Sequence, residues 1–172
     1  MYRFACWART LDDAKAIAAQ PAPTTEILLH LTDYLGVGAD LLDAMIEHRA
    51  GRHAQAQTLA ARAAANSDAL PFAFGPPFLF KPPHELAGEL LLEEKQAKTA
   101  LAQFDRSLKT APMRAESLLG RARALKASGD VAAAAGAYAE LAALWKRADA
   151  DLPALAEVRR EAQTAVAARS KP

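Results

Sequence analysis

The feature that most constrains this chain is a repeat of 34 residues in its second half. Gly88 precedes Ala122 by this interval, Leu91 precedes Leu125, Ala100 precedes Ala134, and Phe104 precedes Tyr138. Small and large apolar residues therefore recur in phase. A repeat of this length corresponds to one helical hairpin, which buries its apolar face only by stacking on a neighbour. The spacing predicts a stack of helical hairpins.

The composition agrees with closely packed helices. Alanine, the strongest helix former, fills about a quarter of the positions, whereas only 8 of the 172 residues are glycine. Small side chains also let helix backbones approach one another closely. The chain is therefore expected to be all-α.

Glycine, proline and capping residues divide the chain into expected helices. In the N-terminal part these lie over about 9–20, 24–35, 40–49 and 53–65, and Gly36-Val37-Gly38 is expected to end the second of them. The later helices are expected over about 84–94, 97–109, 114–128, 131–147 and 152–168.

A segment rich in proline and phenylalanine interrupts this pattern. Five of the 10 prolines and four of the 6 phenylalanines lie between residues 70 and 83, and proline excludes a helix there. Ala56 precedes Ala100 by 44 residues, so the segment is an insertion of about ten residues into the repeat. Its large apolar side chains either pack back on the first hairpin or leave one pair exposed as an anchor for a partner. The candidate anchor residues are Phe72, Phe74, Phe78 and Phe80.

The repeated positions resemble those of the tetratricopeptide repeat (TPR). Its pattern has small residues where two helices cross, a large residue one turn away and a proline that closes the unit. Gly88, Ala100, Phe104 and Pro112 supply this pattern in one unit. The next unit supplies Ala122, Ala134 and Tyr138, and a degraded earlier unit supplies Ala44, Gly51, Ala56 and Ala60. The second half also resembles the C-terminal portion of larger bacterial TPR proteins, through Gly75-Pro76-Pro77 and the run from Glu85 to Glu89.

The resemblance implies a short α-solenoid of TPR-like helical hairpins, with a C-terminal capping helix and the Pro/Phe-rich insertion. The chain is expected to be a single domain over residues 1–172. Its expected parts are degenerate N-terminal helices (1–36), repeat 1 (37–66), the Pro/Phe loop (67–83), repeat 2 (84–114), repeat 3 (115–148), and a capping helix with a tail (149–172).

A TPR-like stack implies a concave groove lined by the first helix of each hairpin. The groove residues expected from the repeat are Leu41, Met45, His48, Glu85, Glu89, Leu92, Leu119, Arg123 and Lys126. Such a groove is apolar at one end, acidic in the middle and basic at the other end. Either it binds a protein or peptide, or its acidic and basic residues pair with each other across adjacent hairpins.

The function predicted from these features is a non-enzymatic protein–protein interaction module or scaffold. The sequence has no glycine-rich phosphate loop, no paired cysteine motif and no nucleophile elbow. No catalytic residue, cofactor or metal is therefore expected. The alternative is an accessory or metal-binding domain of an enzyme that uses His30, His48 or His53. His48 and His53 are five residues apart and flank Gly51, which argues against a ligand pair on one helix face.

Charge and hydropathy limit the partners and the location. The net charge of +1 gives no electrostatic reason to expect nucleic acid or an anionic membrane. No apolar run reaches the roughly 18 residues of a membrane span, and the single cysteine, Cys6, fits a reducing compartment. A cytoplasmic location is predicted. The N-terminal residues are expected to form a truncated hairpin without a polar cap, so Tyr2, Phe4 and Trp7 are expected to promote self-association at the N-terminal end.

Overall fold

The computed structural model describes residues 24–70 and 79–169, and all of the regular structure in these residues is helical. The helices are α2 (Thr24–Arg49), α3 (His53–Asp68), α4 (Pro83–Glu93), α5 (Ala97–Thr110), α6 (Ala115–Ala127), α7 (Val131–Leu144) and α8 (Leu155–Arg169). A short 3₁₀-helix, η1 (Trp145–Arg147), follows α7. The helix expected over residues 9–20 lies outside the described residues.

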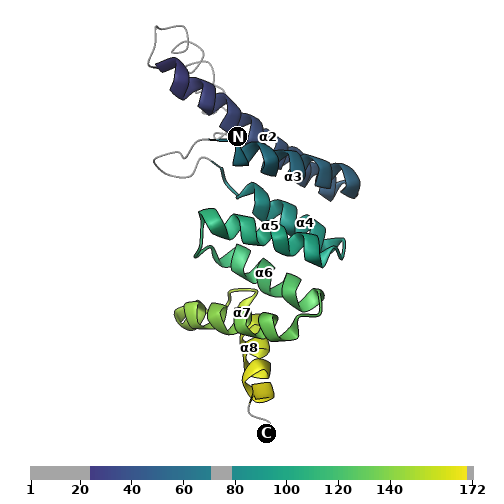
Figure 1. Ribbon diagram of the computed structural model, residues 1–172, viewed down its shortest axis with the longest axis vertical. Coiled ribbons are helices and arrows are strands. Elements are labelled where there is room, and N and C mark those ends of the chain that lie inside the picture. The colour runs from purple at the N-terminus through teal and green to yellow at the C-terminus, as the bar shows by residue number, and fades with distance from the viewer. Residues whose placement is uncertain (1–23, 71–78, 170–172) are drawn as a thin grey trace.

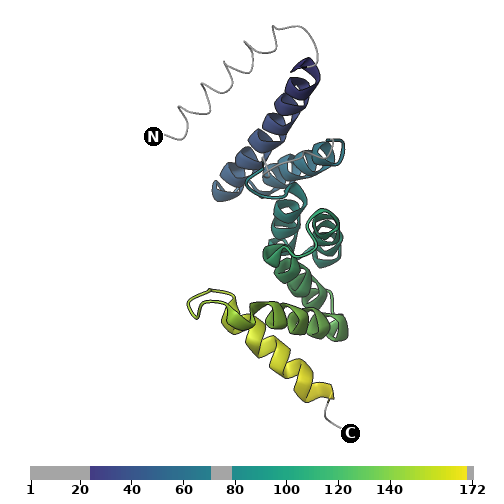
Figure 2. The same ribbon diagram turned by 90° about the vertical axis from the view of Figure 1, so that its left-hand side faces the viewer.

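Consecutive helices pack on one another and form an elongated stack of hairpins (Figure 1). The hairpins are α2/α3, α4/α5 and α6/α7, and α8 packs on α7 at the C-terminal end (Figure 2). The first helices also touch in series, because α2 contacts α4 and α4 contacts α6. The predicted all-α stack of hairpins with a C-terminal helix is confirmed.

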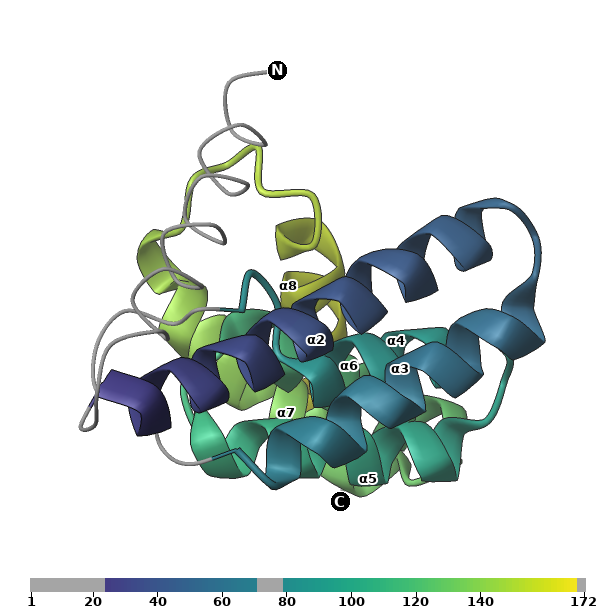
Figure 3. The same ribbon diagram turned by 90° about the horizontal axis from the view of Figure 1, so that it is seen from above.

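Helix α2 is longer than the sequence suggests. The predicted break at Gly36-Val37-Gly38 is wrong, because α2 runs without interruption from Thr24 to Arg49 across the end of the stack (Figure 3). A glycine inside a helix costs only about 1 kcal/mol relative to alanine. Here Val37 and Leu41 are buried in the core of the first hairpin, and Leu79 lies over Gly38. Burial therefore outweighs the low helix propensity of the two glycines, and the expected boundary at residue 36 falls inside α2.

Each hairpin turns through one residue whose backbone is left-handed. The φ angles are +77° at Gly51, +60° at Lys95 and +89° at Gly129. These three positions are equivalent in the repeat once the insertion is counted. The amide of the following residue donates to a carbonyl five residues earlier, as from Gln96 to Leu91 at 2.8 Å. This hydrogen bond is the mark of a Schellman ending, which favours glycine at the left-handed position.

Replacing Lys95 by glycine is expected to stabilise the protein. A non-glycine residue in the left-handed region costs about 1–2 kcal/mol. Glycine avoids this cost, but it has greater conformational entropy in the unfolded chain, which offsets part of the gain. The Lys95→Gly variant should therefore gain roughly 0.5–1 kcal/mol in urea denaturation. The matched variant Gly129→Lys should lose a similar amount. Equal stability of all three proteins would show that the turn is not strained.

One aromatic ring fills the space between the second and third hairpins. Phe104 of α5 is completely buried, and its ring lies against Gly88 of α4 and Gly120 of α6. A Cβ atom on Gly88 would come within 2.9 Å of the ring, and one on Gly120 within 2.2 Å. The predicted roles of Gly88 and Phe104 are confirmed. The repeat does not predict a close contact at Gly120, because the equivalent positions in the neighbouring units are Leu86 and Ala154.

Each interface between hairpins pairs a large residue with a small one, and the order is reversed between the first interface and the next two. In the first interface Ala60 shares a core with Leu86, and in the last Tyr138 shares a core with Ala154. Phe104 and Gly120 occupy the equivalent positions between them. In each interface a small residue on one helix thus meets a large residue on the next helix. The summed side-chain volume of the pair is conserved, although the helix that carries the larger residue differs between interfaces.

Candidate functional site

The candidate site is the face formed by the first helices, and the structure divides its predicted residues into two groups. Leu41, Glu85 and Leu119 are buried, so their side chains are closed to a partner. The others remain at least partly accessible: Met45, His48, Glu89, Leu92, Arg123 and Lys126. The accessible residues come from α2, α4 and α6, which contact one another in series.

Glu85 is buried beneath this face and links the second hairpin to the third. Its side chain is fully buried, and Arg114 donates from Nε and Nη2 to its two carboxylate oxygens at 2.6 and 2.8 Å. The Ser117 hydroxyl donates to Oε2 at 2.6 Å and lies 2.8 Å from the Ser107 hydroxyl. Hydrogen bonding to the carboxylate raises the pKa of Arg114. Glu85 therefore holds α4 to the start of α6. Arg114 precedes its helix, so helix periodicity does not reveal it.

Glu89 lies one turn after Glu85 and is half-buried. Lys81 Nζ lies 2.6 Å from its Oε2. Burial raises the pKa of Glu89, and the nearby carboxylates of Glu85 and Glu116 add to this, whereas the hydrogen bond from Lys81 lowers it. Of the two glutamates expected to make the middle of the face acidic, only Glu89 is accessible, and Lys81 offsets its charge.

The basic end of the face is paired with α8. Arg123 donates from Nε and Nη2 to the two carboxylate oxygens of Glu157 at 3.0 and 2.6 Å, and Lys126 Nζ donates to Glu161 at 2.7 Å. The alternative in which Arg123 and Lys126 pair with Glu85 and Glu89 is wrong. Glu157 follows Arg123 by one repeat, so α8 occupies the position of a further first helix and supplies the opposite charge.

The contacts of Glu157 predict a pH dependence. The hydrogen bond from Arg123, with a second from the Tyr138 hydroxyl at 2.8 Å, lowers the pKa of Glu157 despite partial burial. A lowered folded pKa gives stability that is present above the unfolded pKa and lost as pH falls through the folded pKa. Glu157→Gln should lower Tm by a few degrees at pH 7, since a partly exposed pair contributes under about 1 kcal/mol. The difference between the two proteins should shrink below about pH 4. A difference that is constant from pH 7 to pH 3 would contradict this assignment.

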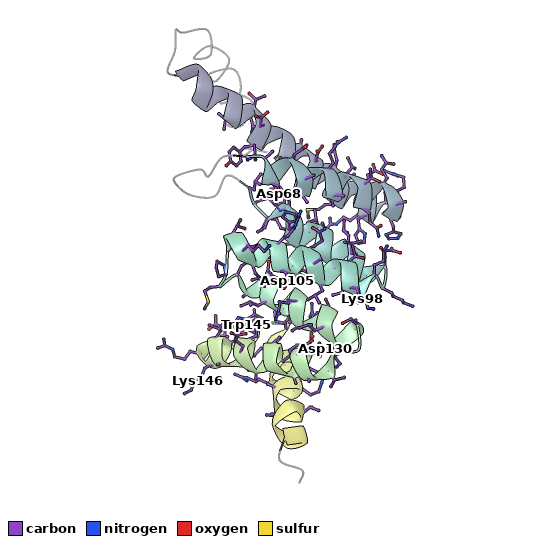
Figure 4. The ribbon with its side chains drawn as sticks, viewed as in Figure 1. Asp68, Lys98, Asp105, Asp130, Trp145 and Lys146 are labelled. Carbon is purple, nitrogen blue, oxygen red and sulfur yellow. The ribbon has the colours of Figure 1, made fainter. Side chains whose placement is uncertain are left out.

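The three histidines whose side chains are described occupy two separate environments. His84 is buried, and its ring nitrogens contact Gln103 Oε1 at 2.7 Å and Asp68 Oδ1 at 2.8 Å. Asp68 also accepts from Arg106 at 2.9 Å, so it links the end of α3 to the next hairpin (Figure 4). The side chain of His30 lies outside the described part. His84 is thus a packing residue with two polar contacts.

His48 and His53 meet across the first turn. Their Nδ1 atoms are 3.2 Å apart, and their ring centroids are 5.0 Å apart. The spacing argument against a ligand pair applies to a single helix, but the turn at Gly51 folds α3 back along α2 and brings the rings together. Among residues 24–70 and 79–169, no group of three or more histidine, cysteine, aspartate or glutamate side chains is arranged to hold a metal ion.

The Pro/Phe segment is described only at its end. Leu79 packs against the core of the first hairpin, whereas the next residue, Phe80, is 55% exposed. Phe72, Phe74 and Phe78 lie outside the described residues. Of the four candidate anchor residues only Phe80 is described, and it is exposed. The choice between packing and exposure stays a prediction for the other three.

A polar hollow between α2 and α3 was not indicated by the sequence. Its volume is about 510 Å³, and Arg62 lines it together with Asp40, whose carboxylate accepts from the Arg62 Nε at 2.8 Å. Asp40 and Arg62 are 22 residues apart on different helices, so no local sequence motif indicates that they pair.

No helix in the described part of the chain combines the length and apolarity needed to cross a membrane.

Comparison with known proteins identifies the fold. No protein-family model and no curated protein sequence matches the chain. Among solved structures, the chain is similar to a TPR-like protein from Chlorobium tepidum, with a TM-score of 0.57 and 20% sequence identity. The match covers 83% of this chain and 99% of the other. Together with the stacked hairpins, this similarity shows that the chain has a TPR-like fold.

Proposed function

We propose that this chain is a non-enzymatic interaction module that binds a protein or peptide through the first-helix face of α2, α4 and α6. The observation that carries the proposal is the serial contact of these helices, which places accessible apolar, acidic and basic residues along one face. A TPR-like fold supports a protein partner, because stacked hairpins present an extended concave surface. The buried hydrogen bonds of Glu85 join α4 to Arg114 and Ser117 at the start of α6, which favours a face that is formed before a partner binds.

The ion pairs at the basic end suggest how a partner engages. Arg123 and Lys126 are each about half exposed, and their carboxylate partners lie on α8. Exposed pairs of this kind contribute little to stability, so a partner carboxylate can replace the α8 carboxylate at small cost. The partner expected from this charge pattern is a segment with apolar residues towards α2 and acidic residues towards α6.

Peptides selected from a random library on the immobilised protein test this proposal. Affinity for a selected peptide should fall at least ten-fold in Met45→Glu and in Lys126→Glu, as measured by fluorescence polarisation. The matched control is Lys98→Glu, because Lys98 is exposed on the second helix α5 (Figure 4). Equal losses in the control, or no loss in the two face variants, would contradict the assignment of the face.

A second surface favours self-association at the α2 end of the stack. Leu42 and Ile46 are 46% and 58% exposed. Their repeat equivalents, Leu86 and Leu90, are both buried in the core that α3 and α4 share. Leu42 and Ile46 thus have the character of residues that are covered by a preceding helix. We propose that a second copy of the chain covers them. Tyr2, Phe4 and Trp7, to which self-association was assigned from the sequence, lie outside the described residues.

Sedimentation analysis over a concentration series tests self-association. The wild type should form a dimer whose population falls in Ile46→Glu. Val131→Glu is the control, because Val131 is 70% exposed on α7 and should not affect assembly. A wild type that remains monomeric at several hundred micromolar would exclude the dimer.

A further inference from the structure

We propose that His48 and His53 form a two-nitrogen binding site for a borderline divalent cation such as Cu²⁺, Ni²⁺ or Zn²⁺. Their Nδ1 atoms are 3.2 Å apart. Bonds from imidazole nitrogen to Zn²⁺ are about 2.0–2.1 Å long, so two nitrogens in tetrahedral positions on one ion are roughly 3.3 Å apart. The distance between the two Nδ1 atoms therefore matches the spacing that chelation of one ion requires.

The turn between α2 and α3 sets this distance. Gly51 has a left-handed backbone, and the Arg52 amide donates to the Glu47 carbonyl at 2.9 Å. The side chains of the same two residues also pair, with Arg52 Nη2 2.8 Å from Glu47 Oε1. The backbone and an ion pair thus fix the end of α2 and the start of α3, which are the elements that carry the two rings.

The second hairpin orients the His48 ring. His48 Nε2 lies 2.9 Å from Glu93 Oε2, so this nitrogen carries a proton and donates it to the carboxylate. In a neutral imidazole the other nitrogen, Nδ1, is then left with its lone pair, which is the form that binds a metal. A carboxylate behind a ligating histidine is the usual outer contact of such sites. Glu94 Oε1 lies 3.5 Å from His53 Nδ1 and adds negative charge beside the second ring.

Binding requires one change of tautomer and no net proton release. In the free protein His53 donates its Nδ1 proton to the Nδ1 lone pair of His48. The cation replaces that proton between the two nitrogens, and His53 takes up a proton at Nε2, so both rings stay neutral. Water completes the coordination shell, since the two side chains are 27% and 48% exposed and the described residues offer no three-residue metal group.

Imidazole ligands determine which cations bind. Nitrogen donors favour Cu²⁺, Ni²⁺ and Zn²⁺ in the Irving–Williams order, whereas Mg²⁺ and Ca²⁺ prefer oxygen ligands. The site should therefore bind Cu²⁺ most tightly. Addition of Mg²⁺ should give no more binding signal than addition of buffer.

Titration calorimetry of the purified chain with Cu²⁺, Ni²⁺ or Zn²⁺ chloride tests the site. We expect one equivalent to bind, and affinity should fall more than ten-fold in His53→Ala and in His48→Ala. His30→Ala is the matched histidine control and should bind as the wild type does. Glu93→Ala retains both ligands and should weaken binding by about ten-fold without abolishing it.

Thermal melting provides a second readout that does not depend on heats of binding. The cation should raise Tm in the wild type but not in His53→Ala, whose own Tm in the absence of metal shows whether it is folded. The proposal is overturned by unchanged affinity in both single histidine variants or by the absence of binding in the wild type. It is also overturned by equal binding of Mg²⁺. None of these outcomes bears on the first-helix face, which is tested by peptide binding.

Discussion

Replacing Gly120 by alanine should destabilise the protein by about 2–3 kcal/mol in urea denaturation. The same change in an open part of a helix stabilises, because alanine has the higher helix propensity. At Gly120 the new Cβ would lie 2.2 Å from the Phe104 ring, which is fully buried and also held by Gly88. Either the buried ring must shift towards its other neighbours or α6 must move away from α5, and both disturb the packing between the second and third hairpins.

Two further variants isolate the effect of the ring. Gly136→Ala places the same methyl group in α7, where no atom beyond the local helix backbone lies within 4 Å of the added Cβ, and should stabilise by up to about 1 kcal/mol. Adding Phe104→Leu to Gly120→Ala should cost less than the sum of the two single changes, because Phe104→Leu removes the ring that the new Cβ would meet. Additive losses would show that Gly120 and Phe104 do not interact.

Replacing Arg114 by methionine should have the largest effect, a loss of about 3–5 kcal/mol. The change leaves Glu85 fully buried without its bidentate partner, although Ser117 still donates one hydrogen bond. A buried carboxylate that has lost its hydrogen-bonded cation is unfavourable because it has also lost its hydration, and the remaining cation, Lys81 Nζ, is 3.9 Å from Glu85 Oε1. Urea denaturation at pH 7 measures the loss.

The double variant Glu85→Met/Arg114→Met separates charge from packing. Replacing both members of a buried pair by apolar residues is often close to neutral, so the double variant should recover most of the stability. Arg121→Met is the surface control, since Arg121 pairs with the exposed Asp105 at 2.7 Å and should contribute under about 1 kcal/mol. A double variant no more stable than Arg114→Met would show that the pair is needed for packing rather than for charge balance.

The fold was predictable because its signal is periodic. The interval of 34 residues identifies the hairpins, and Gly88 with Phe104 marks a crossing that the structure confirms. The continuity of α2 was not predictable, since glycine propensity is a weak local signal and the burial of Val37 depends on tertiary packing. Gly120 was missed for a different reason, because it is the one glycine among equivalents that are Leu86 and Ala154.

The candidate site was predictable only in its helix phase. Periodicity places Glu85 and Leu119 on the first helices, but it does not show that Glu85 is enclosed by Arg114 from outside any helix. Similarly, a spacing of five residues separates His48 from His53 in sequence, and only the turn shows that their rings meet. Contacts between elements therefore decided which predicted residues are accessible.

The order of large and small residues at the interfaces limits where a hairpin can be added or removed. Duplicating the second hairpin would set Phe104 against a copy of Leu86, two large side chains in a space that accommodates a ring and a glycine. Deleting it would set Ala60 against Gly120 and leave a cavity. The second hairpin therefore cannot be duplicated or deleted without compensating substitutions at the new junction. A copy of the third hairpin would instead set Tyr138 against Gly120, a large residue against a small one as in the native pair of Phe104 and Gly120. Growth of this array by simple duplication is thus blocked at the second hairpin and not at the third.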